Sequence, residues 1–300
     1  MSKRKIIIAL LVASAFATGC VPVKFQFEEE IGGSGSSRGQ FLSATNLDIT
    51  KEGNLVIGDN GNSRYQVITP DGNVKVMAGE AGRDGYKLLG MSGLGVNHLT
   101  SDVWVCDQRG NKIVRFDPQG DPNMKVTANL KYPMDVAIDR DGSAFVIMAK
   151  NPKIHHYTPE GDFIEAIGGT GKAALIFPTS ILINDGHLFV SDYGGKRILK
   201  LDTKGNFVAE FKEKGEYEEM KGPSSLHIDN DGNMYVLDLG EVPVVQLAPD
   251  GKLISKIGDF GNDSGKFIYP VGVVAKSQDE IFILDNSRNK ILKFKKKPEN

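Results

Sequence analysis

An aspartate that ends an apolar run recurs along this 300-residue chain at a nearly constant spacing. The series is Asp59, Asp107, Asp192, Asp238 and Asp285, with Met148 in the sixth matching slot, and the steps are 48, 41, 44, 46 and 47 residues. The repeated unit is clearest over residues 181–205, where turn residues separate three strand-like runs. A period in the forties built from strand-like segments is typical of propeller blades, each a four-stranded sheet. The spacing therefore predicts an all-β, six-bladed β-propeller of four-stranded antiparallel blades.

Two further columns follow the anchor positions, the glycine column after the first five of them. A turn glycine stands thirteen residues on, at Gly72, Gly120, Gly161, Gly205 and Gly251. A basic residue stands five residues on, at Arg64, Lys112, Lys153, Arg197 and Lys290, with Pro243 as the exception. An aspartate in such a place can accept backbone N–H groups of the following loop and pair with the basic residue. We therefore interpret the five anchor aspartates as structural, rather than as a ring of metal ligands.

These columns resemble the NHL-repeat family of six-bladed propellers. The resemblance rests on three motifs: D-G-N-M-Y-V-L-D at 231–238, N-K-I-V at 111–114 and the D-P-Q-G turn at 117–120. It extends from about Phe25 to Lys297, so a single propeller domain is expected over 25–297. The family scaffold hosts binding modules and enzymes alike, so the resemblance implies the fold and leaves the function open.

The last repeat lacks its fourth strand, and the N-terminus supplies a candidate. Strand-like runs occupy 271–275, 281–285 and 290–295, after which the chain ends. Residues 23–33 resemble the fourth strand of the other repeats, so we predict that this strand completes the sixth blade and closes the ring. Glu28, Glu29 and Glu30 would then lie beside Lys293, Lys295, Lys296 and Lys297, and closure would remove an exposed sheet edge.

The first residues read as a targeting segment. Lys3, Arg4 and Lys5 precede an apolar run from Ile6 to Phe16, which is too short to span a bilayer. The run ends in A-T-G-C at 17–20, which resembles a bacterial lipobox and implies removal of 1–19, acylation of Cys20 and a short tether over 20–24. Val21 after the cysteine implies the outer membrane, so a lipid-anchored cell-envelope lipoprotein is expected. The alternative is an ordinary secretory signal peptide with an unmodified Cys20.

Charge and loop pattern indicate the class of partner. Removing the three basic residues of the signal from the total of 36 leaves 33 basic against 38 acidic residues. The sequence shows no basic patch with interleaved aromatics, so nucleic acid is not expected. The long, dissimilar loops between blades share one face with the loops after the anchors, and function tends to reside on such loops. We therefore expect a protein, peptide or saccharide partner on this face, with candidate contacts at Tyr86, Phe177, Tyr217, Phe260 and Tyr269.

The first strands of the blades line the central channel and carry the candidate ligand residues. These are Asn46, Asp48, Asp135, Ser180, Ser225 and His227. Lactonase-type propellers hold Ca²⁺ at this place, and the resemblance extends to Asn46 and Asp135 but to no glutamate. Amidating lyases of the NHL type hold zinc with three histidines. Here His155 and His156 are adjacent in one strand and point to opposite faces, and His187 is expected in a turn, which leaves His98 and His227.

No complete catalytic set emerges from these residues. The leading prediction is a non-catalytic binding or scaffold module without a cofactor. The alternative is a metal-assisted hydrolase, lactonase or lyase at the channel mouth, for which Ca²⁺ is the candidate ion.

Overall fold

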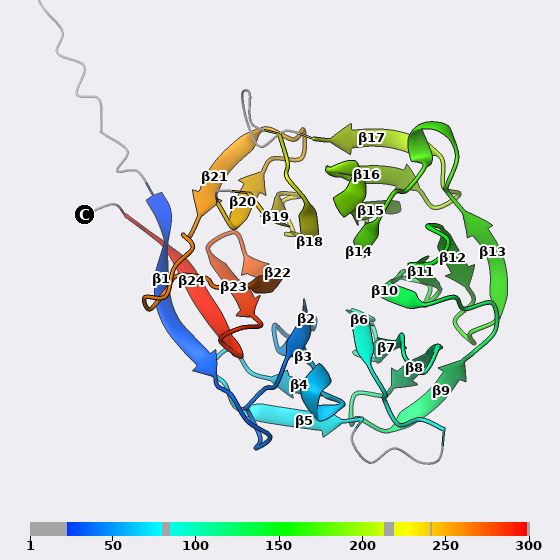
Figure 1. The fold of residues 1–300 in the computed structure, drawn as a ribbon, viewed down its shortest axis with the longest axis horizontal. Helices are drawn as coiled ribbons and strands as arrows, with labels where there is room; N and C mark the ends of the chain where they lie inside the picture. The colour runs from blue at the N-terminus through cyan, green and yellow to red at the C-terminus, as the bar shows by residue number, and fades with distance from the viewer. Residues whose placement is uncertain (1–22, 80–84, 213–218, 241, 299–300) are drawn as a thin grey trace, which may run out of the picture.

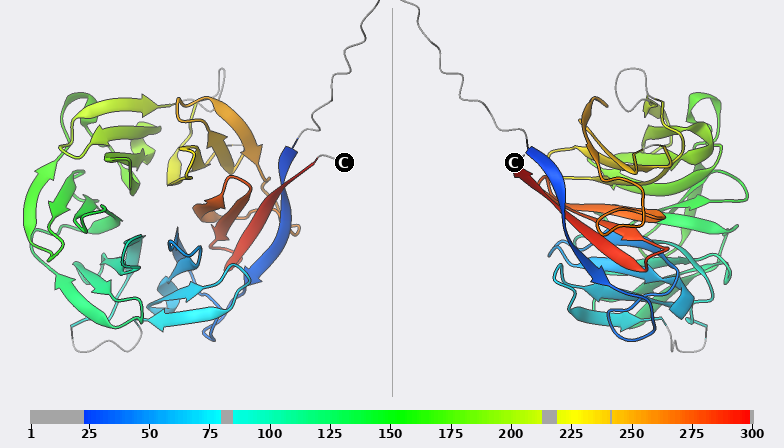
Figure 2. Two further views of the ribbon diagram at one scale, coloured as in Figure 1. Left: turned by 180° about the vertical axis from the view of Figure 1, so that it is seen from behind. Right: turned by 60° about the vertical axis from the view of Figure 1, so that its left-hand side comes forward.

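A computed structural model describes residues 23–79, 85–212, 219–240 and 242–298. Its strands form six four-stranded antiparallel sheets arranged as blades around a central channel (Figure 1). The predicted six-bladed β-propeller is therefore confirmed. Both views of Figure 2 show the blue N-terminal strand and the red C-terminal strand side by side at the rim of the ring.

Each blade runs from an inner strand at the channel to an outer strand at the rim. The first three blades are β2 (Ala44–Ile49), β3 (Leu55–Asp59), β4 (Arg64–Ile68) and β5 (Val74–Ala78); β6 (Met91–Val96), β7 (Val103–Asp107), β8 (Lys112–Phe116) and β9 (Pro122–Val126); and β10 (Pro133–Ile138), β11 (Ala144–Met148), β12 (Ile154–Tyr157) and β13 (Phe163–Ile167). The fourth and fifth are β14 (Pro178–Asn184), β15 (His187–Asp192), β16 (Arg197–Asp202) and β17 (Phe207–Phe211), then β18 (Pro223–Ile228), β19 (Met234–Asp238), β20 (Val244–Leu247) and β21 (Leu253–Ile257). The sixth is β22 (Pro270–Ser277), β23 (Glu280–Asp285), β24 (Lys290–Pro298) and β1 (Val23–Gly32). Short 3₁₀ turns occupy Asn60–Asn62, Gly171–Ala173 and Tyr193–Gly195.

The core lies between neighbouring blades. The second strand of a blade is covered on both faces, so β3, β7, β11 and β19 are buried along their whole length. Outer strands such as β21 alternate between exposed and covered residues, as expected of a sheet with one solvated face. Six hydrophobic clusters result, and each joins two adjacent blades. The disc is therefore held together by packing between blades as much as by hydrogen bonds within them.

The N-terminal strand closes the ring. β1 pairs antiparallel with β24, from Val23 opposite Pro298 to Gly32 opposite Lys290. Glu28 forms ion pairs with Lys293, Lys295 and Lys297, and Glu29 with Lys293. Two details differ from the sequence expectation, because the neighbouring side chains offer closer partners. Lys296 lies over the Phe25 ring and beside Asp279, and Lys290 pairs with Glu30 rather than with the anchor Asp285.

The connections sort onto two faces. What we call the loop face carries the connections between blades, at 33–43, 85–90, 127–132, 168–177, 219–222 and 258–269, together with the loops from second to third strands. What we call the turn face carries the short turns from first to second and from third to fourth strands. Because β24 starts on the loop face and β1 runs antiparallel to it, Val23 and Pro298 lie at the turn-face end of their ladder. No helix within the described part of the chain is long and apolar enough to cross a membrane.

Candidate functional site

A bulge recurs at the mouth of the channel. In all six blades the pairing of the first two strands shifts by one residue near the start of the inner strand. The extra residue is Thr45, Ser92, Met134, Thr179, Ser224 or Val271. A bulge bends the strand and re-aims its side chains, and bulges are frequent beside binding sites. At two of the bulges, the hydroxyls of Ser92 and Thr179 donate hydrogen bonds to the carbonyls of Pro133 and Pro223, respectively, in the next blade.

The six candidate ligand residues all line the central channel, which encloses about 710 Å³. They do not lie at one level. Asn46, Asp135, Ser180 and Ser225 directly follow the bulges and lie toward the loop face. Asp48 and His227 each lie one residue before the end of their strands, so they are near the turn face rather than at the mouth. The sequence interpretation grouped them because it had no measure of depth along the strand.

The two aspartates of the channel act between blades. Asp135 Oδ2 accepts the N–H of Ile181 at 3.0 Å, and Asp48 Oδ2 accepts the N–H of Val96 at 2.9 Å. Both donors belong to the inner strand of the next blade, whose channel-side edge has no strand partner. The carboxyls thus satisfy backbone groups that a propeller leaves open at its axis.

Burial shifts the pKa of three channel groups. It raises the pKa of Asp135 to about 7, against the opposing effect of its backbone hydrogen bonds. It also raises the pKa of Asp48. For His227, burial and the nearby His98 lower the pKa to about 4, so its imidazole is neutral at pH 7. The channel therefore holds a carboxyl that titrates near neutrality and an uncharged imidazole.

The donors do not gather into a recognisable metal set. Among the described residues, no group of three or more His, Cys, Asp or Glu side chains is placed to hold an ion. His155 packs against Phe163, and the His156 ring stacks on Phe145 at 4.2 Å, both within the third blade. His187 is the first residue of β15 rather than a turn residue, and its Nδ1 lies 2.8 Å from the carbonyl of Asp185. These three histidines therefore lie outside the channel lining, whereas His98 and His227 are both part of it.

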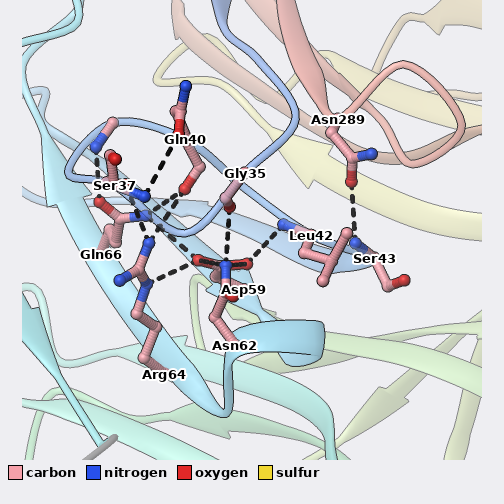
Figure 3. Close-up of polar contacts among 11 residues, drawn as sticks. Gly35, Ser37, Gln40, Leu42, Ser43, Asp59, Asn62, Arg64, Gln66 and Asn289 are labelled. Atoms are coloured by element: carbon pink, nitrogen blue, oxygen red, sulfur yellow. Dashed lines mark hydrogen bonds and ion pairs between the residues drawn. The ribbon is translucent and has the colours of Figure 1, made fainter.

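The five anchor aspartates are buried beneath the loop face. Asp59 accepts the N–H of Leu42 at 2.7 Å and pairs with Arg64 Nε at 2.7 Å, inside a network that includes Asn62 and Gln66 (Figure 3). The other anchors bond the two residues that precede the inner strand of their own blade: Leu89 and Gly90 to Asp107, Ile176 and Phe177 to Asp192, Lys221 and Gly222 to Asp238, and Ile268 and Tyr269 to Asp285. Most of these bonds reach the loop before the blade, not the loop after the anchor. The anchors thus fix the rim of the channel mouth.

Large apolar side chains gather on that rim. Ten of the fourteen exposed large hydrophobic residues in the described chain lie on the loop face: Leu42, Leu89, Tyr132, Ile176, Phe177, Tyr193, Leu239, Phe260, Ile268 and Tyr269. Several of them have backbone N–H groups held by an anchor. With those N–H groups bound from below, the side chains point outward. Contiguous exposed apolar surface of this kind marks interaction sites.

A pocket of about 340 Å³ lies within this apolar rim. Its lining residues are Phe177, Thr179, Tyr193, Ser224, Leu239, Tyr269, Pro270 and Val271. Thr179, Ser224 and Val271 also line the channel, so the pocket opens onto the channel mouth. The Phe177 and Tyr193 rings meet edge to face at 6.0 Å. Gly222 lets the Tyr193 ring lie on its backbone, because a Cβ there would come within 2.6 Å of the ring.

The sequence identified only part of this pocket. Phe177 and Tyr269 were among the five candidate aromatics, and both line it. Tyr86 instead packs against the core between the first two blades, and Phe260 forms an isolated β-bridge with Phe267 and does not line the pocket. Tyr217 falls outside the described residues. Tyr193 and Leu239 were missed. Their position in the repeat could have identified them, because each directly follows an anchor aspartate.

Comparisons with known proteins support this architecture. No protein-family model matches the chain. Human E3 ubiquitin-protein ligase TRIM32 is 23% identical over 287 residues, which cover 90% of this chain and 38% of that protein. A probable peptidyl-alpha-hydroxyglycine alpha-amidating lyase of Caenorhabditis elegans, pgal-1, is 27% identical over 202 residues, 58% of each. The chain thus spans less than two thirds of these curated relatives.

Among solved structures, virginiamycin B lyase from Staphylococcus aureus superposes with a TM-score of 0.62 at 17% identity, covering 91% of this chain and 99% of that one. At this identity the likeness concerns the fold. Together, the comparisons support a six-bladed propeller that is similar to NHL-repeat-type proteins.

Proposed function

We propose that the chain is a non-catalytic binding or scaffold module whose loop face engages a protein partner. The observation that carries this proposal is the concentration of exposed apolar side chains around the channel mouth, with a preformed pocket among them. Aromatic and aliphatic anchors in such pockets supply most of the energy of protein interfaces. A saccharide partner is the competing ligand on the same face.

Attachment to the bacterial cell envelope through Cys20 belongs to the same proposal. The lipobox-like A-T-G-C run supports it, and the direction of β1 indicates which face such an anchor would bring to the membrane. Val23 lies at the turn-face end of its ladder, only three residues after Cys20. A lipid at Cys20 would bring the turn face toward the membrane and leave the loop face directed away from it. Incorporation of labelled palmitate into the wild-type protein, but not into Cys20→Ser, tests the anchor.

Crosslinking tests the binding function. A photoreactive residue placed at Leu42 or Ile268 on the loop face should yield one identified envelope protein. The same residue at Leu99 on the turn face should yield none. The crosslink should also be lost in Tyr269→Ala. Equal crosslinking from both faces, or exclusive crosslinking to glycan, would reject a protein partner on the loop face.

A metal-assisted hydrolase, lactonase or lyase is the second candidate. Two observations favour it: the likeness to pgal-1, whose name describes a lyase, and the Asp135 carboxyl, whose pKa of about 7 suits proton transfer at neutral pH. Elemental analysis of the purified protein, with a panel of esters and lactones as substrates, discriminates the two functions. One bound Ca²⁺ or Zn²⁺ per chain together with turnover, both lost in Asp135→Ala, would establish the enzyme. If neither bound metal nor turnover is found, the binding module remains the proposed function.

A further inference from the structure

The loop face carries an apolar pocket and, elsewhere on its rim, exposed basic residues. The apolar pocket lies over the fourth, fifth and sixth blades. Across the mouth, on the loops of the second and third blades, lie three exposed basic residues: Arg109, Lys131 and Lys150. The described loops around them, 85–90, 108–111, 127–132 and 149–153, contain no acidic residue. Within these described segments, all of the charged residues are therefore basic.

Contacts within the fold place these cations beside the mouth. The stem of Arg109 packs over Gly90, where an added Cβ would meet its Cδ at 2.5 Å. Lys150 Nζ lies 3.9 Å from the centre of the Tyr132 ring, and Tyr132 directly follows Lys131. Within the described part of the chain, none of the ion pairs involves Arg109, Lys131 or Lys150. Arg109 and Lys131 are therefore exposed without an acidic partner among the described residues, and Lys150 is exposed beside the Tyr132 ring.

We propose that the partner binds through an extended acidic segment that crosses the channel mouth. A large apolar side chain of the segment occupies the pocket lined by Phe177, Tyr193, Leu239 and Tyr269, and its carboxylates meet Arg109, Lys131 and Lys150. This inference rests on the proposed binding function and specifies its ligand. Charge complementarity argues for an acidic partner, because the positively charged side chains attract carboxylates. The apolar pocket argues for a side chain rather than a solvated anion.

The design implies that the two contacts act together. When two modules of a ligand are joined, affinity depends on the length of the linker and is greatest when the linker matches the span between the sites. An acidic tract or an aromatic residue alone should therefore bind much more weakly than the two joined. Salt should weaken only the acidic contact, because the Debye length falls to about 8 Å at physiological ionic strength.

Labelled model peptides test this proposal directly. The probes are a tryptophan and three aspartates separated by two, four or six glycines, the same peptides with lysines in place of the aspartates, and an oligodeoxythymidylate as a polyanion without an apolar side chain. Fluorescence anisotropy with the full-length mature protein should show binding of an acidic peptide with an optimum spacer. Lys131→Glu with Lys150→Glu should weaken it by at least about tenfold, and so should Tyr269→Ala. Lys204→Glu and Leu99→Ser on the turn face serve as matched controls.

Each other outcome overturns the inference. Equal binding of the lysine peptides would refute the acidic class, and tighter binding of the oligonucleotide would assign the face to nucleic acid. Failure of every peptide, while the loop-face crosslink to an envelope protein persists and is unaffected by Lys131→Glu with Lys150→Glu, would reject this ligand but leave the binding function standing. If the wild-type sequence with the photoreactive residue on the loop face gives no crosslink, both the acidic ligand and the binding function are rejected.

Discussion

The loop face and the turn face are built by the same twenty-four strands, yet they expose different chemistry. On the turn face, aspartates stabilise their own turns: Asp202 accepts the N–H groups of Lys204 and Asn206, and Asp117 those of Gln119 and Asp121. These two side chains bind local backbone and remain partly exposed. On the loop face the anchor aspartates are buried and bind the backbone of the rim. The comparison shows how a repeat can expose variable side chains: the carboxylate holds the backbone of the loop, whatever residue stands there.

The largest effect is expected from removing an anchor. Asp59→Ala should destabilise the protein by about 3–5 kcal/mol, because it leaves the Arg64 side chain, 1% exposed, without the carboxylate beside it. Urea unfolding followed by circular dichroism measures this change. Asp59→Asn, which keeps the shape, serves as the control. A loss below about 1 kcal/mol would mean that the network does not hold the rim.

The second effect separates binding from stability on the loop face. Tyr269→Ala should weaken partner binding by about 2 kcal/mol or more, because an aromatic anchor of the pocket is removed. Since the Tyr269 side chain is half exposed, its removal should change the free energy of unfolding by only about 0.5 kcal/mol. Leu99→Ser on the turn face should alter neither quantity. Calorimetric binding and thermal unfolding of the same samples test both statements.

The channel connects the two faces, and its Asp135 and His227 side chains should respond oppositely to pH. The folded-state pKa of Asp135 is raised to about 7, so its contribution to stability falls as pH rises from about 4 to 7. The folded-state pKa of His227 is lowered to about 4, so its contribution rises with pH from about 4 to 6.5. Each slope reaches at most about 1.4 kcal/mol per pH unit.

Single substitutions reveal the two slopes. In Asp135→Asn only the His227 contribution remains, so the free energy of unfolding should increase with pH between about 4 and 6.5. In His227→Gln only the Asp135 contribution remains, so the free energy of unfolding should decrease with pH between about 4 and 7. Urea titrations at several pH values measure them. Parallel profiles for wild type and both variants would contradict the burial of these groups.

The smallest effect is expected on the turn face. Asp202→Ala removes hydrogen bonds that an exposed turn can replace with water, so the cost should be about 1 kcal/mol or less. Peptide or partner binding should be unchanged. A loss as large as that of Asp59→Ala would erase the distinction between the two faces.

The sequence predicted what repeats and failed where several repeats combine. The anchor spacing predicted the fold, and the missing fourth strand of the last repeat predicted the ring closure. Both can be read from the order of strand-like runs along the chain. The pocket joins Phe177, Tyr193, Leu239 and Tyr269 from three blades, and no local pattern reports that meeting. Asp48 and His227 appeared to belong to the mouth because sequence gives the strand but not the depth. Likewise, the raised pKa of Asp135 follows from burial between blades, which a single repeat does not display.

The closing ladder between β1 and β24 has a mechanical consequence. A pull on the N-terminus along the strand direction must slide β1 past β24, from Val23 opposite Pro298 to Gly32 opposite Lys290. In this shearing geometry the hydrogen bonds and the Glu28 and Glu29 ion pairs bear the load together, instead of breaking one after another. Rupture would also open the ring at the sixth blade. A tether attached ahead of Val23 would therefore make one strand pair both the fastening of the disc to its surroundings and the clasp that keeps the disc shut.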